Sequence, residues 1–228
     1  MVRRTERAYD RELRDVRERL LLMAGRVELM IADAVRALID RDPDLAHRTI
    51  QVDRLVNRAE VEIDELCMLI LVKRQPMARD MRFVAVALKM VTDLERIGDL
   101  AVNMAERAID LSAVPHSRHY EDIARIASTA QRMVRDVMDA FVNWDAERAE
   151  QVMLSDDEVD EAYHVLFRSL LETMIRDPST IEACAHLQSM AKYLERIGDH
   201  ATNLAEHVIF MVDAKDVRHH GKLGARSI

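Results

Sequence analysis

The sequence predicts an all-α protein made of two tandem homologous three-helix bundles. Composition is the first observation: only 5 Gly and 4 Pro occur among 228 residues, 32% of the residues are charged and 4% are aromatic. Such a composition is typical of long helices and unusual for β-sheets. Duplication is the second observation, since the hexapeptide LERIGD stands at residues 94–99 and again at residues 194–199. The spacing of 100 residues indicates one helical unit that occurs twice.

Three long segments of the first half carry apolar residues at helical spacing. We expect helices over about residues 5–41, 44–73 and 78–112. Each would be about 45–55 Å long at 1.5 Å per residue. Pro43 and Pro76 separate them, because the residue before a proline leaves the helical conformation. The first bundle is therefore predicted at residues 5–113.

The second half repeats this organisation after a linker at residues 114–117. We expect its helices over about residues 120–142, 146–176 and 179–213. Asp53 and Asp156 stand 103 residues apart, as do Asp42 and Asp145, so the repeat extends beyond LERIGD. The second bundle is predicted at residues 118–215. Residues 216–228 are predicted to be a flexible tail.

Bulk properties exclude several classes of protein. A formal net charge of −8 disfavours nucleic acid as a partner, because its phosphates must be neutralised by Lys and Arg. The longest apolar run, residues 66–72, is far short of the roughly 20 residues that span a bilayer, so contact with a membrane would be indirect. Cys67 and Cys184 lack CxxC spacing and are expected to be buried reduced thiols. Without an apolar secretory segment near the N-terminus, a cytoplasmic location is expected.

An acidic stripe follows one side of the third and sixth predicted helices. At about 100° per residue, its members fall within an arc of about 80°, nearly opposite the apolar seam that contains Leu94 and Ile97. The stripe consists of Glu95, Asp99, Asn103 and Glu106 in the third helix and of Glu195, Asp199, Asn203 and Glu206 in the sixth. Acid stands over acid here, whereas a solvated helix face usually alternates acids with Lys or Arg.

The second and fifth predicted helices carry a matching set of acids. In the second helix they fall within an arc of about 60°. The set consists of Asp53, Asn57, Glu60 and Asp64 in the second helix and of Asp156 and Asp160 in the fifth, where Tyr163 and Phe167 replace the last two acids. Several converging oxygens are what a hard cation needs. We therefore predict a metal site in each bundle, richer in the first, with a solvated face as the alternative.

Other residues near the stripes have alternative interpretations. A glycine in mid-helix, as at Gly98 and Gly198, destabilises the helix by roughly 1 kcal/mol relative to alanine. Its presence in both repeats indicates the close approach of another helix or of a ligand. Arg96 and Arg196 either pair with the acids or extend over the surface. His200 follows Asp199 but points about 100° away from it, so it is a weak ligand candidate. The basic corner, formed by Lys73, Arg74, Arg79 and Arg82, is either an anion or docking site or a solvated loop.

The doubled LERIGD followed by NMAE or NLAE, with QPMARDMR at residues 75–82, resembles the PhoU family of phosphate-signalling regulators. The resemblance covers roughly residues 10–212. It implies two similar three-helix bundles that carry multinuclear iron or zinc clusters, held by E/DxxxD motifs. The matching pairs are Glu95 with Asp99, Glu195 with Asp199, and Glu60 with Asp64. Carboxylates also accept Mn or Mg, so the residues alone leave the metal open.

The resemblance also implies a role. The family restrains phosphate uptake and the phosphate-starvation response, and is thought to bridge the ATPase of a phosphate ABC transporter and a phosphate-sensing histidine kinase. No catalytic activity is expected, and a homodimer is one expectation for the assembly. The alternative is a carboxylate-bridged di-iron enzyme or metal store of the ferritin-like type. That class usually needs two Glu-x-x-His motifs, and only Glu161 with His164 provides one.

Overall fold

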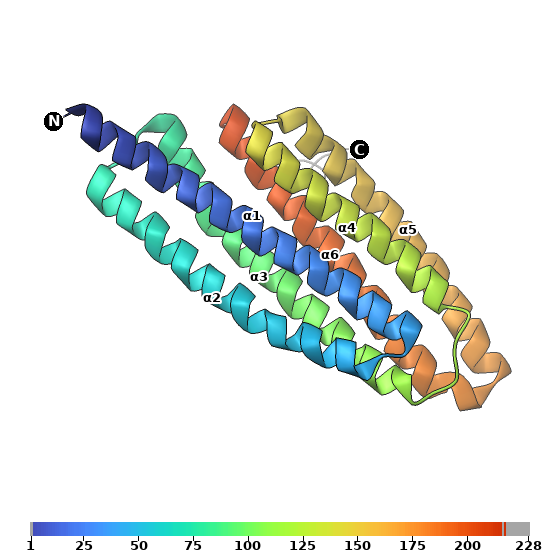
Figure 1. The fold of residues 1–228 in the computed structure, drawn as a ribbon. Coiled ribbons are helices and arrows are strands. Elements are labelled where there is room, and N and C mark those ends of the chain that lie inside the picture. Colours follow the sequence, from blue (N-terminus) through green and yellow to red (C-terminus); the bar gives the residue numbers. More distant parts are fainter. Residues whose placement is uncertain (1, 216, 218–228) are drawn as a thin grey trace, which may run out of the picture.

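The computed structural model describes residues 2–215 and 217, and this part of the chain contains six α-helices, one short 3-10 turn and no strand (Figure 1). The elements are α1 (Val2–Asp40), α2 (Pro43–Arg74), α3 (Ala78–Ser112), α4 (Tyr120–Asn143), α5 (Ala146–Arg176), η1 (Pro178–Thr180) and α6 (Ile181–Asp213). The all-α prediction of two tandem three-helix units is confirmed. The tail predicted at residues 216–228 lies outside the described residues, apart from residue 217.

The start of the sixth helix was predicted two residues too early. Pro178–Thr180 forms a 3-10 turn, and α6 begins only at Ile181. The carboxylate of Asp177 accepts hydrogen bonds from the backbone nitrogen of Ser179 at 3.0 Å and from its hydroxyl at 2.7 Å. These two bonds close a tighter turn than the α-helix allows.

The two three-helix units lie side by side, with α3 and α6 in contact at the centre and α1 against α4 (Figure 1). The central pair is antiparallel, because residues early in α3 meet residues late in α6. Arg82 donates to the backbone carbonyl of Met211 at 3.2 Å, and Arg107 contacts His186 at 3.3 Å. Residues 5–113 and 118–215 remain the predicted extents of the two units.

Apolar seams hold each central helix in place. Leu94, Ile97 and Ala101 of α3 are fully buried, and so are their counterparts in α6, beginning with Leu194 and Ile197. Burying a large apolar side chain stabilises the fold by about 1.5–3 kcal/mol, so these seams dominate the packing. The acids of the predicted stripes lie on the opposite side of α3 and α6.

Two sequence predictions about single residues are also confirmed. Cys67 and Cys184 are free and buried. Asp42 and Asp145 occupy equivalent corners, and their side chains accept from the backbone nitrogens of Leu45 and Arg148 at 2.9 and 3.0 Å. Such N-terminal caps stabilise a helix by about 1 kcal/mol. None of the helices in the described part of the chain is long and apolar enough to cross a membrane.

Candidate metal centre

The predicted acids gather in two places, one in each unit. The first acid cluster comprises Asp53, Glu60 and Asp64 of α2 with Glu95 and Asp99 of α3. The second acid cluster comprises Asp156 and Asp160 of α5 with Glu195 and Asp199 of α6. The two clusters occupy equivalent positions in the repeat.

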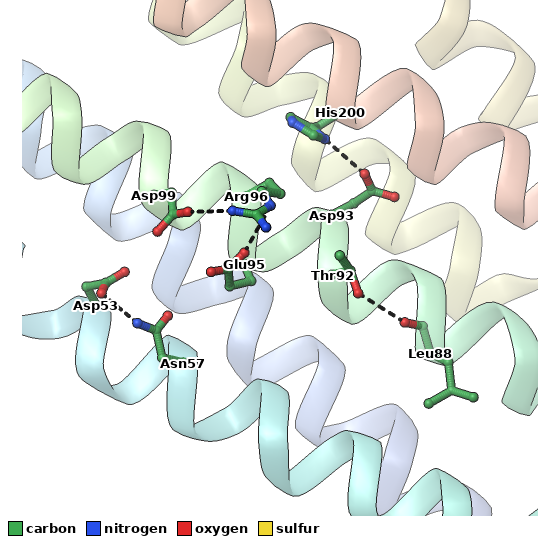
Figure 2. Close-up of polar contacts among 9 residues, drawn as sticks. All are labelled: Asp53, Asn57, Leu88, Thr92, Asp93, Glu95, Arg96, Asp99 and His200. Carbon is green, nitrogen blue, oxygen red and sulfur yellow. Dashed lines mark hydrogen bonds and ion pairs between the residues drawn. The ribbon is translucent and has the colours of Figure 1, made fainter.

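In the first acid cluster, carboxylates of two helices face one another. Figure 2 shows Asp53 on α2 turned toward Glu95 and Asp99 on α3. Burial raises the pKa of Asp53, and the charge of Asp99 raises it further. Burial likewise raises the pKa of Glu95, with Asp99 next in importance, and it raises the pKa of Glu60, with Asp64 next. Like charges therefore repel one another across the α2–α3 contact.

Arg96 pairs with the acids of the first cluster, which is the first of the two interpretations given for it above. Its guanidinium lies 3.1 Å from Asp99 Oδ2 and 3.5 Å from Glu95 Oε2 (Figure 2). Asn57 Nδ2 donates to Asp53 Oδ2 at 2.8 Å. Arg196, the repeat counterpart of Arg96, has no ion-pair partner among the side chains of residues 8–215 and 217, which are those that the structure describes. The two clusters are therefore neutralised in different ways.

The second acid cluster contains the acid whose pKa is raised most, Asp156. Burial raises the pKa of Asp156 to about 6, and the charges of Asp160 and Asp199 add to this effect. Burial also raises the pKa of Asp199, with Glu195 as the next cause. Lys192 Nζ lies 2.6 Å from Glu195 Oε2 and supplies the nearest positive charge.

Four carboxylate oxygens of the clusters are buried and accept no hydrogen bond from the described residues. They are Asp53 Oδ1, Asp64 Oδ1, Asp156 Oδ1 and Glu195 Oε2, and the last of these forms an ion pair with Lys192. A buried acceptor without a donor is costly, by about 1–3 kcal/mol and more for a charged group. A bound cation would satisfy such oxygens, so the donor set fits a hard metal ion.

The repeated glycines allow the helices to approach one another beside the acids. A Cβ on Gly198 would lie 2.7 Å from Asp156 Oδ1 and 3.5 Å from Val159 Cγ1. A Cβ on Gly98 would lie 3.3 Å from Val56 Cγ1. Close helix packing is therefore confirmed as the reason for these glycines, and in the second unit the neighbour is a cluster carboxylate.

Four predicted residues make no direct polar contact with the cluster acids. No hydrogen bond or ion pair in the described part of the chain joins Asn103, Glu106, Asn203 or Glu206 to the cluster acids. Glu106 instead lies 3.8 Å from Arg107. As the described side chains stand, those of residues 8–215 and 217, no three His, Cys, Asp or Glu residues are arranged to hold a metal ion. The acids are gathered without converging on one point, so metal binding stays a prediction.

His200 belongs to another group of residues, which sequence reasoning missed. Its Nδ1 lies 2.9 Å from Asp93 Oδ1 across the α3–α6 contact (Figure 2), and His207 Nε2 lies 3.3 Å from Asp93 Oδ2. Burial alone would raise the pKa of Asp93, but hydrogen bonds from the two histidines outweigh it and hold the pKa below its usual range. His200 thus links the two units. No local pattern predicts this group, because it depends on the pairing of two distant helices.

The basic corner is largely engaged within the protein. Arg74 makes a bidentate pair with Glu12 at 2.7 and 2.8 Å. The guanidinium carbon of Arg79 lies 3.9 Å from the centroid of the Trp144 ring. Arg82 donates a hydrogen bond to the backbone carbonyl of Met211 in α6. Three of the four cations therefore join elements of the fold.

Comparison with known proteins identifies the family. The family model described as the PhoU domain matches residues 20–108 and again residues 123–208, one match in each unit. The chain belongs to the PhoU family. A relative from Pseudomonas aeruginosa (strain PAO1), the phosphate-specific transport system accessory protein PhoU homolog, is 44% identical over 214 residues, which cover 93% of this chain and 88% of the relative.

Further PhoU proteins agree in sequence and in fold. The phosphate-specific transport system accessory protein PhoU of Escherichia coli (strain K12) is 36% identical over 93% of this chain and 88% of its own length. The crystal structure of PhoU from Pseudomonas aeruginosa superposes with a TM-score of 0.87 at 43% identity, covering 91% of this chain and all of that chain. The doubled unit is therefore the PhoU fold.

The raised pKa of Asp156 in this PhoU chain predicts how stability depends on pH. Between the ordinary value of 3.8 and about 6, the folded protein holds a proton that the unfolded chain has lost, so stability falls as pH rises through that window. In the presence of a chelator, Asp156→Asn should therefore melt at a higher temperature than wild type at about pH 7.5. The difference should vanish near pH 4.

Glu150→Gln provides the control, because Glu150 is exposed on the same helix and loses the same charge. Thermal unfolding followed by circular dichroism measures both variants across the pH range. A lower melting temperature for Asp156→Asn at pH 7.5 would contradict the repulsion inferred in the second acid cluster.

Proposed function

We propose that this chain is a non-enzymatic, cytoplasmic negative regulator of phosphate uptake and phosphate-starvation signalling. In this proposal it acts as a metal-binding adaptor, alone or as a homodimer, between the ATPase of a phosphate ABC transporter and a phosphate-sensing histidine kinase. The names of its relatives, phosphate-specific transport system accessory proteins, support the part in phosphate transport. The doubled acid cluster is the observation that supports the metal-binding part.

The metal in this proposal is an iron or zinc cluster, with Mn or Mg as alternatives. The first acid cluster would hold it with carboxylates from two helices, Asp53, Glu60 and Asp64 on one and Glu95 and Asp99 on the other. When bound, the metal would supply positive charge that offsets their mutual repulsion and joins α2 to α3. The second acid cluster would hold its metal with fewer carboxylates, because Tyr163 and Phe167 stand where the first has Glu60 and Asp64.

The ferritin-like alternative gains no support from the residues that motivated it. His164 lies against the ring of Tyr163, with 5.3 Å between ring centroids. The cluster acids lie on the side of α3 and α6 opposite the buried seams, whereas di-iron carboxylate proteins project their ligands into the bundle core. We therefore favour the adaptor.

Metal content tests the first half of the proposal. Protein purified from metal-replete cells should contain iron, zinc or manganese, and the double variant Asp99→Ala with Asp199→Ala should lose most of it, because each substitution removes an acid from one cluster. Elemental analysis of the purified proteins measures this. The control is Asp40→Ala with Glu150→Ala, two exposed acids outside the clusters. Equal metal in the two double variants would contradict the assignment of ligands.

Binding to purified partners tests the second half. The immobilised protein should bind the isolated ATPase subunit of the phosphate transporter and the cytoplasmic part of the kinase from the same cell. The ATPase subunit of an unrelated transporter is the control. Biolayer interferometry with and without Mn²⁺ measures the affinities. Failure of both partners to bind above the control, in either condition, would contradict the adaptor role.

A further inference from the structure

The two acid clusters differ in the position of their nearest cation. In the second cluster it is Lys192, whose Nζ lies 2.6 Å from Glu195 Oε2. The repeat counterpart of Lys192 is Thr92, which carries no charge and bonds back to the carbonyl of Leu88 at 3.4 Å (Figure 2). The lysine is therefore a feature of the second unit alone.

The ammonium of Lys192 sits among the groups of the second cluster. It lies 5.5 Å from the ring centroid of Tyr163, the residue that replaces Glu60 of the first unit. Burial and Glu195 raise the pKa of Asp199, and the charge of Lys192 acts in the opposite direction. The ammonium thus lies between Glu195 of α6 and the aromatic face of Tyr163 on α5, and its charge also acts on Asp199.

In the first cluster the nearest positive charge belongs to Arg96, which lies at the solvent-exposed edge of the cluster. The side chain of Arg96 is 57% exposed and spans Glu95 and Asp99 at 3.5 and 3.1 Å. Its planar guanidinium is large and delocalised, whereas the ammonium of a lysine is a compact point charge, closer in character to a metal ion. The pair of Lys192 with Glu195 is also the shorter one, at 2.6 Å, whereas the side chains of Glu195 and Glu95 are equally exposed.

We propose that Lys192 makes the second acid cluster the weaker of two cation sites, because its tethered ammonium competes with a divalent cation for Glu195. This inference rests on the metal-binding part of the proposed function. A cation that enters the second cluster must break the 2.6 Å ion pair of Lys192 with Glu195 and displace a positive charge. The displaced ammonium can turn into water, since the Lys192 side chain is 46% exposed. The second cluster is then the one that responds to changes in cation supply.

An exchange of residues between the repeats tests the inference. Lys192→Thr and Thr92→Lys each introduce the residue that the other unit carries, so both should fold. Calorimetric titration of chelator-treated protein with Mn²⁺ should resolve a tighter and a weaker class of sites in wild type. Lys192→Thr should tighten the weaker class by about fivefold, as expected for the loss of one competing pair of about 1 kcal/mol. Thr92→Lys should weaken the tighter class by a similar factor.

Lys89→Thr is the matched control. It makes the same change of residue, but Lys89 lies over the ring of Phe210, with 6.0 Å between its Nζ and the ring centroid. Both classes should keep their wild-type affinities in this variant. Asp199→Asn shows which class of Mn²⁺ sites belongs to the second acid cluster, because it should abolish the weaker class only.

Two outcomes separate this inference from the proposal beneath it. If wild type binds Mn²⁺ and Lys192→Thr behaves like Lys89→Thr, the role of Lys192 is wrong while metal binding stands. If neither wild type nor Lys192→Thr binds Mn²⁺, the metal-binding part of the proposed function fails and this inference fails with it.

Discussion

Burial of the apolar seams is the constraint on which the rest of the structure depends. The seams of α3 and α6 fix how closely α2 and α5 approach, and Gly98 and Gly198 remove the side chains that would hold them apart. Acids on the adjacent faces are thereby brought together. Each large apolar side chain buried in a seam contributes about 1.5–3 kcal/mol, whereas one repulsion between partly exposed charges costs about 1 kcal/mol or less. Packing therefore outweighs the repulsion, and like charges remain side by side.

Duplication has preserved this arrangement while the two units have diverged around it. Gly98 and Gly198, and the acids on either side of them, recur in both units. What differs is the surroundings: two acids of α2 give way to aromatic residues in α5, and a lysine enters beside Glu195. The contact between the units carries its own polar group, formed by Asp93 with two histidines. The two clusters therefore occupy equivalent positions in the repeat but contain different numbers of charged residues.

Much of the fold and part of the site follow from the sequence, for local reasons. Helical periodicity and proline positions predict the helices, because both act within a few residues. Periodicity also assigns Glu95 and Asp99 to the polar side. It cannot tell which polar residues of α3 meet a partner on the neighbouring helix, and Asn103 and Glu106 make no hydrogen bond or ion pair with the cluster acids in the described part of the chain. The contacts of Asp93 and Arg74 depend on distant helices and leave no local pattern.

The dependence of stability on cation concentration tests the central claim, which is that packing brings together carboxylates that a cation would relieve. A ligand that binds only the folded state stabilises it by about 2.7 kcal/mol at a concentration 100 times its Kd. Thermal unfolding of the wild-type protein at neutral pH, measured as Mn²⁺ is added after chelation, should therefore give a steadily rising melting temperature. Unfolding at the same or a lower temperature across that titration would contradict the account.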